Sequence, residues 1–397
     1  MDCQLEINIE RVIKWTNHSN WLNEISVQNG TNYYFKNVQF DFIVNVSTGA
    51  NTYYFEECVF TKGLNFETAF RNESQETTNH YEKEIYFYKC KIDGQFVAQR
   101  SVFDKNFRLH NCCVENLILK NATFNALADF WLTKFNNGVT FYKTDFQQTA
   151  VFSMATFRGN VLFTYALFAG KTIFARTKFK KGLDLSQAII SGDLQPFDLQ
   201  FNFKEFKAEY VGKDDEAFQN YVDRDAIIPL VNKVHTFQVL KKAFQDIGNY
   251  SDSILMQREE KRALKELIKL KLKDEDSSVN NGDKWILNLN RISNHYQSDF
   301  RNGIWFTLCM TIVFGFLTLV FTEEFQRHFC WGCEFNKDYF IKGVKFLFNF
   351  LNQTRRITYL DSFDLRFYGI AYLFDFFGLM AVGYGIYQTI QAFRKFK

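Results

Sequence analysis

Phenylalanine recurs at a regular spacing through the first half of the chain. Between Phe124 and Phe179 the phenylalanines stand alternately six and five residues apart, and Leu185 and Ile190 continue the series. A small or apolar residue stands two positions before each of them. An α-helix cannot keep a repeat of this form on one inward face, and a β-strand alternates at every second residue. The pattern therefore predicts a coil that turns a corner after every five or six residues.

The same spacing extends towards the N-terminus as far as Tyr33, with a polar insertion at residues 71–84. The segment from Ala155 to Phe163 reads as two consecutive faces of one coil. This pattern resembles the pentapeptide-repeat family, whose members form a right-handed quadrilateral β-helix with one pentad on each face. The resemblance covers residues 31–200. We interpret the sixth residue in alternate units as a one-residue bulge at a corner.

The segments that flank the solenoid follow from changes in this pattern. Residues 1–30 are expected to cap its open end, because an uncapped end would expose strand edges and stacked rings. The two prolines, Pro196 and Pro229, lie near the end of the series and mark a domain boundary. Residues 201–282 are expected to form an α-helical linker hairpin, because apolar residues then recur at three- and four-residue intervals. Its charged run, residues 258–262, is either a partner-binding surface or a solvated helix face.

The final segment, residues 283–397, is predicted to be a helical membrane domain. Residues 303–321 contain no charged side chain and are long enough to span a bilayer, and residues 367–393 are apolar except for one carboxylate. Residues 339–351 are too short to cross and are expected to form an interfacial or re-entrant helix. Basic residues before the first span and after the second place both termini in the cytoplasm, although the loop between the spans is also basic.

A narrower resemblance rests on the order of these parts and on two loose motifs. The segments Thr236–Lys242 and Ile292–Tyr296, followed by a Trp- and Phe-rich span, are similar to those of bacterial pentapeptide-repeat proteins with a C-terminal two-span membrane module. This resemblance implies a bacterial inner-membrane protein and supplies no catalytic residues. Separately, Cys58, Cys90 and Cys112 occupy inward positions of the solenoid series, where a thiol is a small buried apolar group, which favours a reducing cytosol.

Three residues of the second span are candidates for a pore or for an interhelical contact: Asp375, Gly383 and Gly385. A carboxylate within a span usually faces a bundle interior or water, but Asp375 lies near one end of the stretch and could instead stay hydrated there. Gly383 and Gly385 belong to a Val-Gly-Tyr-Gly sequence that is typical of potassium-channel filters. Too few residues follow for the final spanning helix that such a filter requires, and glycines within a span more often permit close helix packing. A pore that several two-span subunits line with the second helix remains an open alternative.

Other motifs indicate little chemistry. Gly170-Lys171-Thr172 is similar to a phosphate-binding loop, but Tyr165 stands where that loop requires glycine. His328, Cys330 and Cys333 form a cluster that lacks an obvious fourth metal ligand, and the two cysteines could instead form a disulfide. The sequence contains no recognised nucleophile elbow, metalloprotease helix or dinucleotide fingerprint. We therefore predict no enzyme activity, no metal site and no cofactor.

The charge balance bears on the partners. Some pentapeptide-repeat proteins imitate DNA with a strongly acidic surface, but residues 85–200 hold 14 Lys and Arg against 8 Asp and Glu. We expect no nucleic-acid partner. The partners expected are the lipid bilayer, an unnamed protein on the β-helix and further copies of this chain. The expected function is a cytosolic β-helix that binds or scaffolds a partner and is coupled to a two-span domain that oligomerises into an ion pore. The alternative is a passive membrane-tethered scaffold without transport activity.

Overall fold

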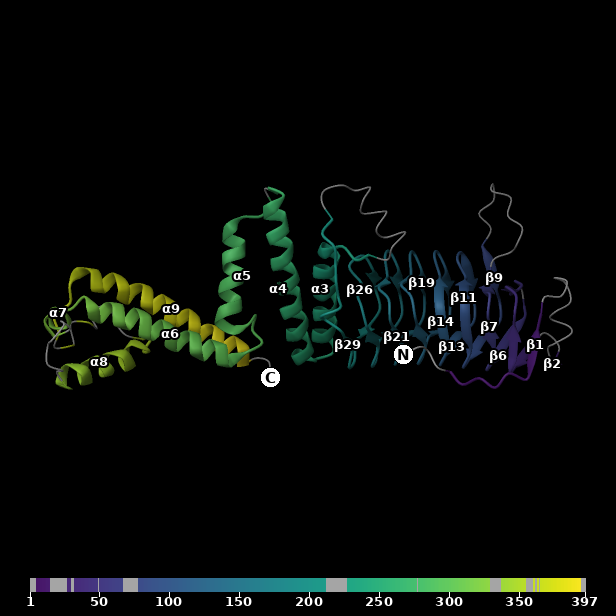
Figure 1. Cartoon of the computed structure of the whole chain (residues 1–397), viewed down its shortest axis with the longest axis horizontal. Coiled ribbons are helices and arrows are strands. Elements are labelled where there is room, and N and C mark those ends of the chain that lie inside the picture. Colours follow the sequence, from purple (N-terminus) through teal and green to yellow (C-terminus); the bar gives the residue numbers. More distant parts are fainter. Residues whose placement is uncertain are drawn as a thin grey trace. The chain divides into compact units, whose positions relative to one another are not determined.

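The computed structural model describes residues 5–14, 27–29, 32–48, 50–66, 78–211, 227–276, 278–328, 337–354, 360, 363 and 365–393. The chain divides into two compact units, Met1–Asn249 and Tyr250–Lys397, which we describe separately. Figure 1 shows a β-solenoid with one covering helix in the first unit and a set of α-helices in the second.

Short strands build the solenoid, and within the described residues they form three hydrogen-bonded sheets. All the pairs are parallel except the pair formed by β2 and β3. The first sheet contains β1 (Arg11–Ile13), β4 (Val38–Phe40), β5 (Val44–Asn45), β7 (Val59–Phe60), β8 (Gly63–Asn65), β11 (Lys91–Val97), β14 (Cys113–Ile118), β17 (Lys134–Phe135), β18 (Val139–Thr140), β21 (Thr156–Phe157), β22 (Val161–Leu162), β25 (Lys178–Phe179), β26 (Leu183–Asp184) and β29 (Gln200–Phe201). The second contains β2 (Val27–Asn29), β3 (Asn32–Lys36), β6 (Thr52–Glu56), β10 (Ile85–Tyr88), β13 (Phe107–His110), β16 (Ala128–Asp129), β20 (Ala150–Val151), β24 (Thr172–Ile173) and β28 (Leu194–Gln195). The third contains β9 (Asn79–Tyr81), β12 (Ser101–Phe103), β15 (Thr123–Phe124), β19 (Asp145–Phe146), β23 (Leu167–Phe168) and β27 (Ile189–Ile190).

The three sheets make four faces, because β11 and β14 bend over one corner and pair on both sides of it. In the regular part, Ala128 pairs with Ala150, Ala150 with Thr172, and Thr172 with Leu194. One coil therefore runs from residue 128 to residue 150 and advances the chain by 22 residues, which is two five-residue and two six-residue steps. The predicted β-solenoid of stacked coils is confirmed.

The interior of the solenoid is a set of stacked aromatic columns. Phe130, Phe152 and Phe174 lie in one column, with ring centroids 5.1 and 5.0 Å apart. These distances match the spacing of about 4.8 Å between neighbouring strands, so each coil places its ring directly on the ring of the coil before. The three rings are fully buried, and burial of each contributes about 2–3 kcal/mol. Parallel columns contain Phe135, Phe157 and Phe179; Phe124, Phe146 and Phe168; and Phe141 and Phe163.

Two kinds of corner alternate around the coil. At the five-residue steps the chain makes a tight turn, as where the amide of Thr133 donates to the carbonyl of Phe130 at 3.3 Å and Leu132 has a φ of 58°. A positive φ at the third position is characteristic of a type II turn. At the six-residue steps the corner is a wider bend. The predicted bulge is wrong for residues 128–201, because every coil carries the extra residue at the same place and the pairs stay in register.

The helix α3 (Leu230–Asp246) packs on β26 and β28 at the C-terminal end of the solenoid. The buried carboxylate of Asp184 fastens it: Asn232 Nδ2 donates to Oδ2 at 2.8 Å and Thr236 Oγ1 donates to Oδ1 at 3.4 Å. Thr236 Oγ1 in turn accepts from the amide of Leu185 at 2.9 Å. These bonds satisfy polar groups that a further coil would otherwise pair, which is the role of a solenoid cap. At the other end β1 pairs with β4, so the first strand of the solenoid lies within residues 1–30.

The second unit is helical. It contains α4 (Tyr250–Lys273), α5 (Asn281–Asn294), α6 (Phe300–Val320), α7 (Glu323–His328), α8 (Lys337–Phe350) and α9 (Gly369–Phe393). A capping box starts α5, in which Asn280 and Asp283 exchange hydrogen bonds of 3.0 Å, and His295 with a φ of 51° ends it. Of the two helices within the predicted linker hairpin, α3 belongs to the unit that contains the solenoid. The other, α4, belongs to the unit that contains the apolar helices α6 and α9. The helix α5 occupies the start of the segment expected to form the membrane domain.

Candidate functional site

The outer surface of the second sheet carries an ordered group of rings, which we call the aromatic face: Tyr54, Tyr86, Tyr88, His110 and Trp131. Register explains the group, because Tyr54 pairs with Tyr86 and Tyr88 pairs with His110 on successive coils. Tyr86 contacts His110 edge to face at a centroid distance of 5.4 Å, and His110 contacts Trp131 at 5.7 Å. Trp131 remains 38% exposed.

Carboxylates hold two of these rings, Tyr54 and His110. His110 Nε2 lies 2.7 Å from Asp129 Oδ2, and Tyr54 donates to Glu84 at 3.2 Å. Arg108 and Asn106 also bond the carboxylate of Glu84. Burial raises the pKa of Tyr86, so this ring stays neutral and can donate a hydrogen bond at ordinary pH. The face therefore presents tyrosine, tryptophan and arginine, residue types that are enriched at protein interfaces, and some of these side chains are already held in place.

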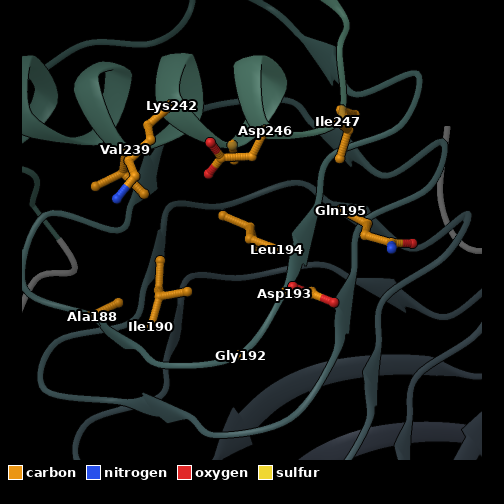
Figure 2. Close-up of a pocket in the computed structure, with 11 residues that line it drawn as sticks. Ala188, Ile190, Gly192, Asp193, Leu194, Gln195, Val239, Lys242, Asp246 and Ile247 are labelled. Carbon is orange, nitrogen blue, oxygen red and sulfur yellow. The ribbon is translucent and has the colours of Figure 1, made fainter.

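A groove of about 510 Å³ lies between α3 and the last coil of the solenoid. Figure 2 shows Asp246 and Val239 of α3 on one side and Leu194 and Ile190 of the coil on the other. The groove forms because, among the described residues, no strand pairs with β27 beyond Ile190, and α3 packs on β26 and β28 instead. Its lining mixes apolar side chains with Asp193 and other polar groups, so it suits a peptide side chain better than a small anion.

The second unit contains a helical hairpin of a different kind. Both α6 and α9 are long and apolar enough to cross a membrane, with mean hydropathies of 2.1 and 1.5. They are antiparallel: Phe300 stacks on Phe393 at 4.9 Å at one end, and Thr322 bridges Phe367 at the other. At 1.5 Å per residue α6 is about 32 Å long, close to the thickness of a bilayer core. The two predicted apolar spans are therefore present as helices.

Small and polar residues fill the interface of the hairpin. A Cβ added at Gly303 would lie 2.6 Å from Thr389 Oγ1, so the two backbones approach as closely as glycine permits. The buried threonines satisfy themselves within their own helix: Thr307, Thr311 and Thr318 each donate to the carbonyl four residues before, at 2.8, 2.9 and 2.8 Å. Between residues 302 and 393, the exposed side chains of α6 and α9 are apolar or aromatic.

The three candidate residues of the second span all lie within the continuous helix α9. Asp375 is 8% exposed and Gly385 is buried. A Cβ at Gly385 would meet Thr307 Oγ1 at 2.5 Å and the Cα of Thr307 at 3.1 Å, whereas a Cβ at Gly383 would meet only the end of the Gln353 side chain. The two glycines therefore have different surroundings within one chain. Whether any of the three lines a pore stays a prediction.

A polar cluster fastens α5 to the end of α9. Asn294 donates to the carbonyl of Gln388 at 3.2 Å and also bonds its side chain, and Tyr384 donates to Asn290 Oδ1 at 2.8 Å. Ser293 and Asn294 are fully buried. Sequence reasoning did not identify α5 as a separate helix, although the Asn280 capping box was a readable signal. The cluster itself needs the fold, because its members lie more than 90 residues apart.

Comparison with known proteins identifies the solenoid. Residues 141–189 match the family described as pentapeptide repeats (9 copies). The solenoid is a pentapeptide-repeat β-helix. No curated protein and no solved structure matches the chain. The family match agrees with the 22-residue coils and with the inward phenylalanines, and it says nothing of the helical unit that follows.

Pentapeptide-repeat solenoids are typically structural or interaction scaffolds rather than enzymes. The Gly170-Lys171-Thr172 segment belongs to the repeats of the solenoid. Thr172 lies in β24 and is buried, like the other small residues that stand two positions before an inward phenylalanine. A Cβ at Gly170 would lie 2.5 Å from the backbone of Gln148, so this glycine serves the close approach of neighbouring coils. The segment thus has a structural explanation.

The helix α8 occupies the range predicted for an interfacial or re-entrant segment. Phe346 and Phe350 are fully buried against Leu319 and Val382, while Phe348 on another side is 73% exposed. The cluster of Cys330 and Cys333 lies outside the described residues. Within the described residues, no group of three His, Cys, Asp or Glu side chains could hold a metal ion.

Of the five described cysteines, four are free, including the exposed Cys309, and one is disulfide-bonded. Cys58, Cys90 and Cys112 are buried and free, and burial raises the pKa of Cys90 well above that of an ordinary thiol. The neighbouring Cys113 is disulfide-bonded. The free thiols agree with the reducing compartment expected from sequence, and the disulfide counts against it. Membrane association is indicated by α6 and α9; the compartment stays a proposal.

Proposed function

We propose that this protein is a membrane-anchored interaction scaffold, in which the aromatic face of the β-helix binds a protein partner and α6 and α9 hold the chain in a bilayer. The anchor is supported by the side-chain pattern of the hairpin, which is the inverse of the pattern in the solenoid. Its polar residues, such as Thr311 and Asp375, face inward, and its outer surface is apolar. A pair of helices that borders lipid on all other sides needs that arrangement.

Antiparallel packing supports one element of the topology. If both helices cross the bilayer, the chain before Phe300 and the chain after Phe393 emerge on the same side. Basic residues at these ends favour the cytoplasmic side. The location that we propose is the bacterial inner membrane, with the β-helix and both termini in the cytoplasm.

The partner is proposed from the chemistry of the aromatic face. Tyrosine, tryptophan and arginine are enriched at the centres of protein interfaces, and rings that are already held by hydrogen bonds lose little entropy on binding. The net basic balance of residues 85–200 fits neither a DNA mimic nor a dedicated nucleic-acid binder at this density. We propose no catalytic role.

Site-specific photo-crosslinking in intact membranes tests this function. A photoreactive residue at Trp131 should capture one protein, and Arg108→Ala should abolish that capture. The matched control is Ile189 in β27 of the third sheet, which is 56% exposed and should capture nothing specific. Capture at both positions, or at neither, would contradict a partner site on the aromatic face. Resistance to alkaline carbonate extraction, lost on deletion of residues 300–393, tests the anchor.

An ion pore built from several copies is the second candidate. Asp375 favours it, because a buried carboxylate within an apolar helix is usually functional. A ring of four or more subunits in nanodiscs and a current changed by Asp375→Asn would support it. A monomer or dimer without current would leave the anchored scaffold.

A further inference from the structure

The helix α5 has an apolar stripe on the side that is turned away from α4, the helix against which the buried Leu287 lies. Trp285 and Ile292 are seven residues apart, which places them two turns apart on one face, and they are 67% and 60% exposed. Leu287 and Asn294 have the same spacing and are buried. Leu287 follows Trp285 by two positions, and Asn294 follows Ile292 by two. Two positions correspond to a rotation of about 200° around a helix, so the stripe lies opposite the buried face.

The direction of α5 is set by its attachment to the hairpin. Its C-terminal end is bonded to α9 through Asn294 and Gln388, and it packs on both α6 and α9. Figure 1 shows that α5 runs crosswise to these two helices, at the ends that carry Phe300 and Phe393. A helix fixed crosswise at the end of a pair of spanning helices lies along the surface of the membrane.

Cations accompany the stripe. Lys284 and Arg291 are also seven residues apart, and they lie on the side of α5 between the stripe and the buried face. Lys265 and Lys269 of α4 approach them: burial, and then the charges of Arg291, Lys284 and Lys269, lower the pKa of Lys265. The nearby carboxylate of Asp283 is engaged in the capping box with Asn280. Four positive groups therefore gather beside exposed tryptophan and isoleucine.

We infer that α5 is an interfacial helix that lies in the headgroup layer of the bilayer, with Trp285 and Ile292 inserted among the lipids and Lys284 and Arg291 bound to the phosphates of anionic phospholipids. Tryptophan prefers this layer, and an amphipathic helix with a basic flank binds anionic membranes. Lys265 and Lys269 strengthen the positive potential behind it. A protein occupant would not require the crosswise placement at the ends of the spans. The inference rests on α6 and α9 spanning the bilayer.

Contact quenching by brominated phospholipids tests the assignment in full-length chains in nanodiscs. The contribution of one tryptophan is the difference between the chain and its Trp→Phe variant. Trp305 of α6 is the matched control, because it is 66% exposed within a span. In nanodiscs with anionic lipid, both the Trp285 and the Trp305 contributions should be quenched. The double variant Lys284→Glu/Arg291→Glu should expose Trp285 to acrylamide and leave Trp305 unchanged, and each lost cation weakens the association about five-fold.

The outcomes separate the two proposals. If brominated lipids did not quench the Trp305 contribution of the unchanged chain, α6 would not span the bilayer. The proposed function would then be overturned as well. Quenching at Trp305 with none at Trp285 would overturn only the interfacial helix. Zwitterionic nanodiscs should weaken the Trp285 contribution; equal quenching in both lipids would contradict the phosphate contacts. Inorganic phosphate should release Trp285 no more than chloride at equal ionic strength, and a phosphate-specific release would assign the cations to a free anion instead.

Discussion

The two units bury opposite kinds of side chain. In the solenoid, rings such as Phe152 fill the interior and charged residues such as Lys178 face outward. In the hairpin of α6 and α9, threonine, glycine and a carboxylate lie inside, and Phe376 and Met380 face outward. The hydrophobic effect drives the first arrangement, whereas lipid outside a helix pair removes that drive and leaves packing and hydrogen bonding.

Phenylalanine therefore has a different structural role in each unit. Phenylalanine is abundant in both units, yet only in the solenoid does its spacing specify a structure, because each ring must stack on the ring one coil before. In the hairpin the small residues specify the structure, as at Gly303 and Gly385, and the outer phenylalanines need only be apolar.

Removal of one phenylalanine ring from each unit tests whether the rings stabilise the solenoid more than the hairpin. We expect Phe152→Ala to destabilise the solenoid by about 3–5 kcal/mol, because the cavity opens inside a stacked column. We expect Phe376→Ala, at an exposed position of α9, to change the stability of the hairpin by less than about 1 kcal/mol. Thermal unfolding of the full-length chain in nanodiscs, followed by limited proteolysis of each unit, measures both. Similar losses in the two units would contradict the inverted pattern.

Substitutions at the two glycines of α9 sharpen the comparison inside the hairpin. Gly385→Leu should destabilise it by about 1–3 kcal/mol, because the new side chain meets the backbone of Thr307. Gly383→Leu should cost less, because only the end of the Gln353 side chain must move. Stability in nanodiscs is again the measurement. If both glycines instead lined a pore between copies, the two substitutions would alter subunit number or current alike.

These residues also show how far the sequence could lead. The Phe series predicted the solenoid, because its core is a local repeat, and the apolar runs predicted α6 and α9. The predicted corner bulge was wrong for residues 128–201, since a regular extra residue leaves the strand register unchanged there. The Asp184 bonds to α3 and the Asn294 bonds to Gln388 were not predictable, because they join residues 48 and 94 positions apart through tertiary structure. The aromatic face required the strand register before its rings could be placed together.

The contact between α4 and the C-terminal end of α5 should respond to pH. Burial and the neighbouring guanidinium groups of Arg262 and Arg258 lower the pKa of His295, whose Nε2 lies 3.0 Å from Arg262. A lowered histidine pKa means that the unfolded state binds the proton first as the pH falls below about 6.5, so stability decreases there. The free energy of unfolding of the second unit should therefore drop between pH 6.5 and the folded pKa.

The control for this prediction is His295→Gln, which retains an acceptor for Arg262 and does not titrate. This variant should lose the pH dependence of the second unit while its stability at pH 8 stays close to that of the unchanged chain. A pH dependence that survives the substitution would assign the effect to another group.

The smallest effect expected lies at the corners of the solenoid. Arg176 and Lys178 are exposed in the same coil, but Arg176 has a φ of 56° and Lys178 belongs to β25. The left-handed conformation costs an L-residue about 1–2 kcal/mol, whereas glycine in a strand costs about 0.5–1 kcal/mol through backbone entropy. Arg176→Gly should therefore be neutral or stabilising by up to about 1 kcal/mol, since its ion pair with Asp198 is solvent-exposed and weak. Lys178→Gly should destabilise. Equal losses in chemical denaturation would show that the tight corners carry no strain, and the solenoid would then differ from the hairpin only in what it buries.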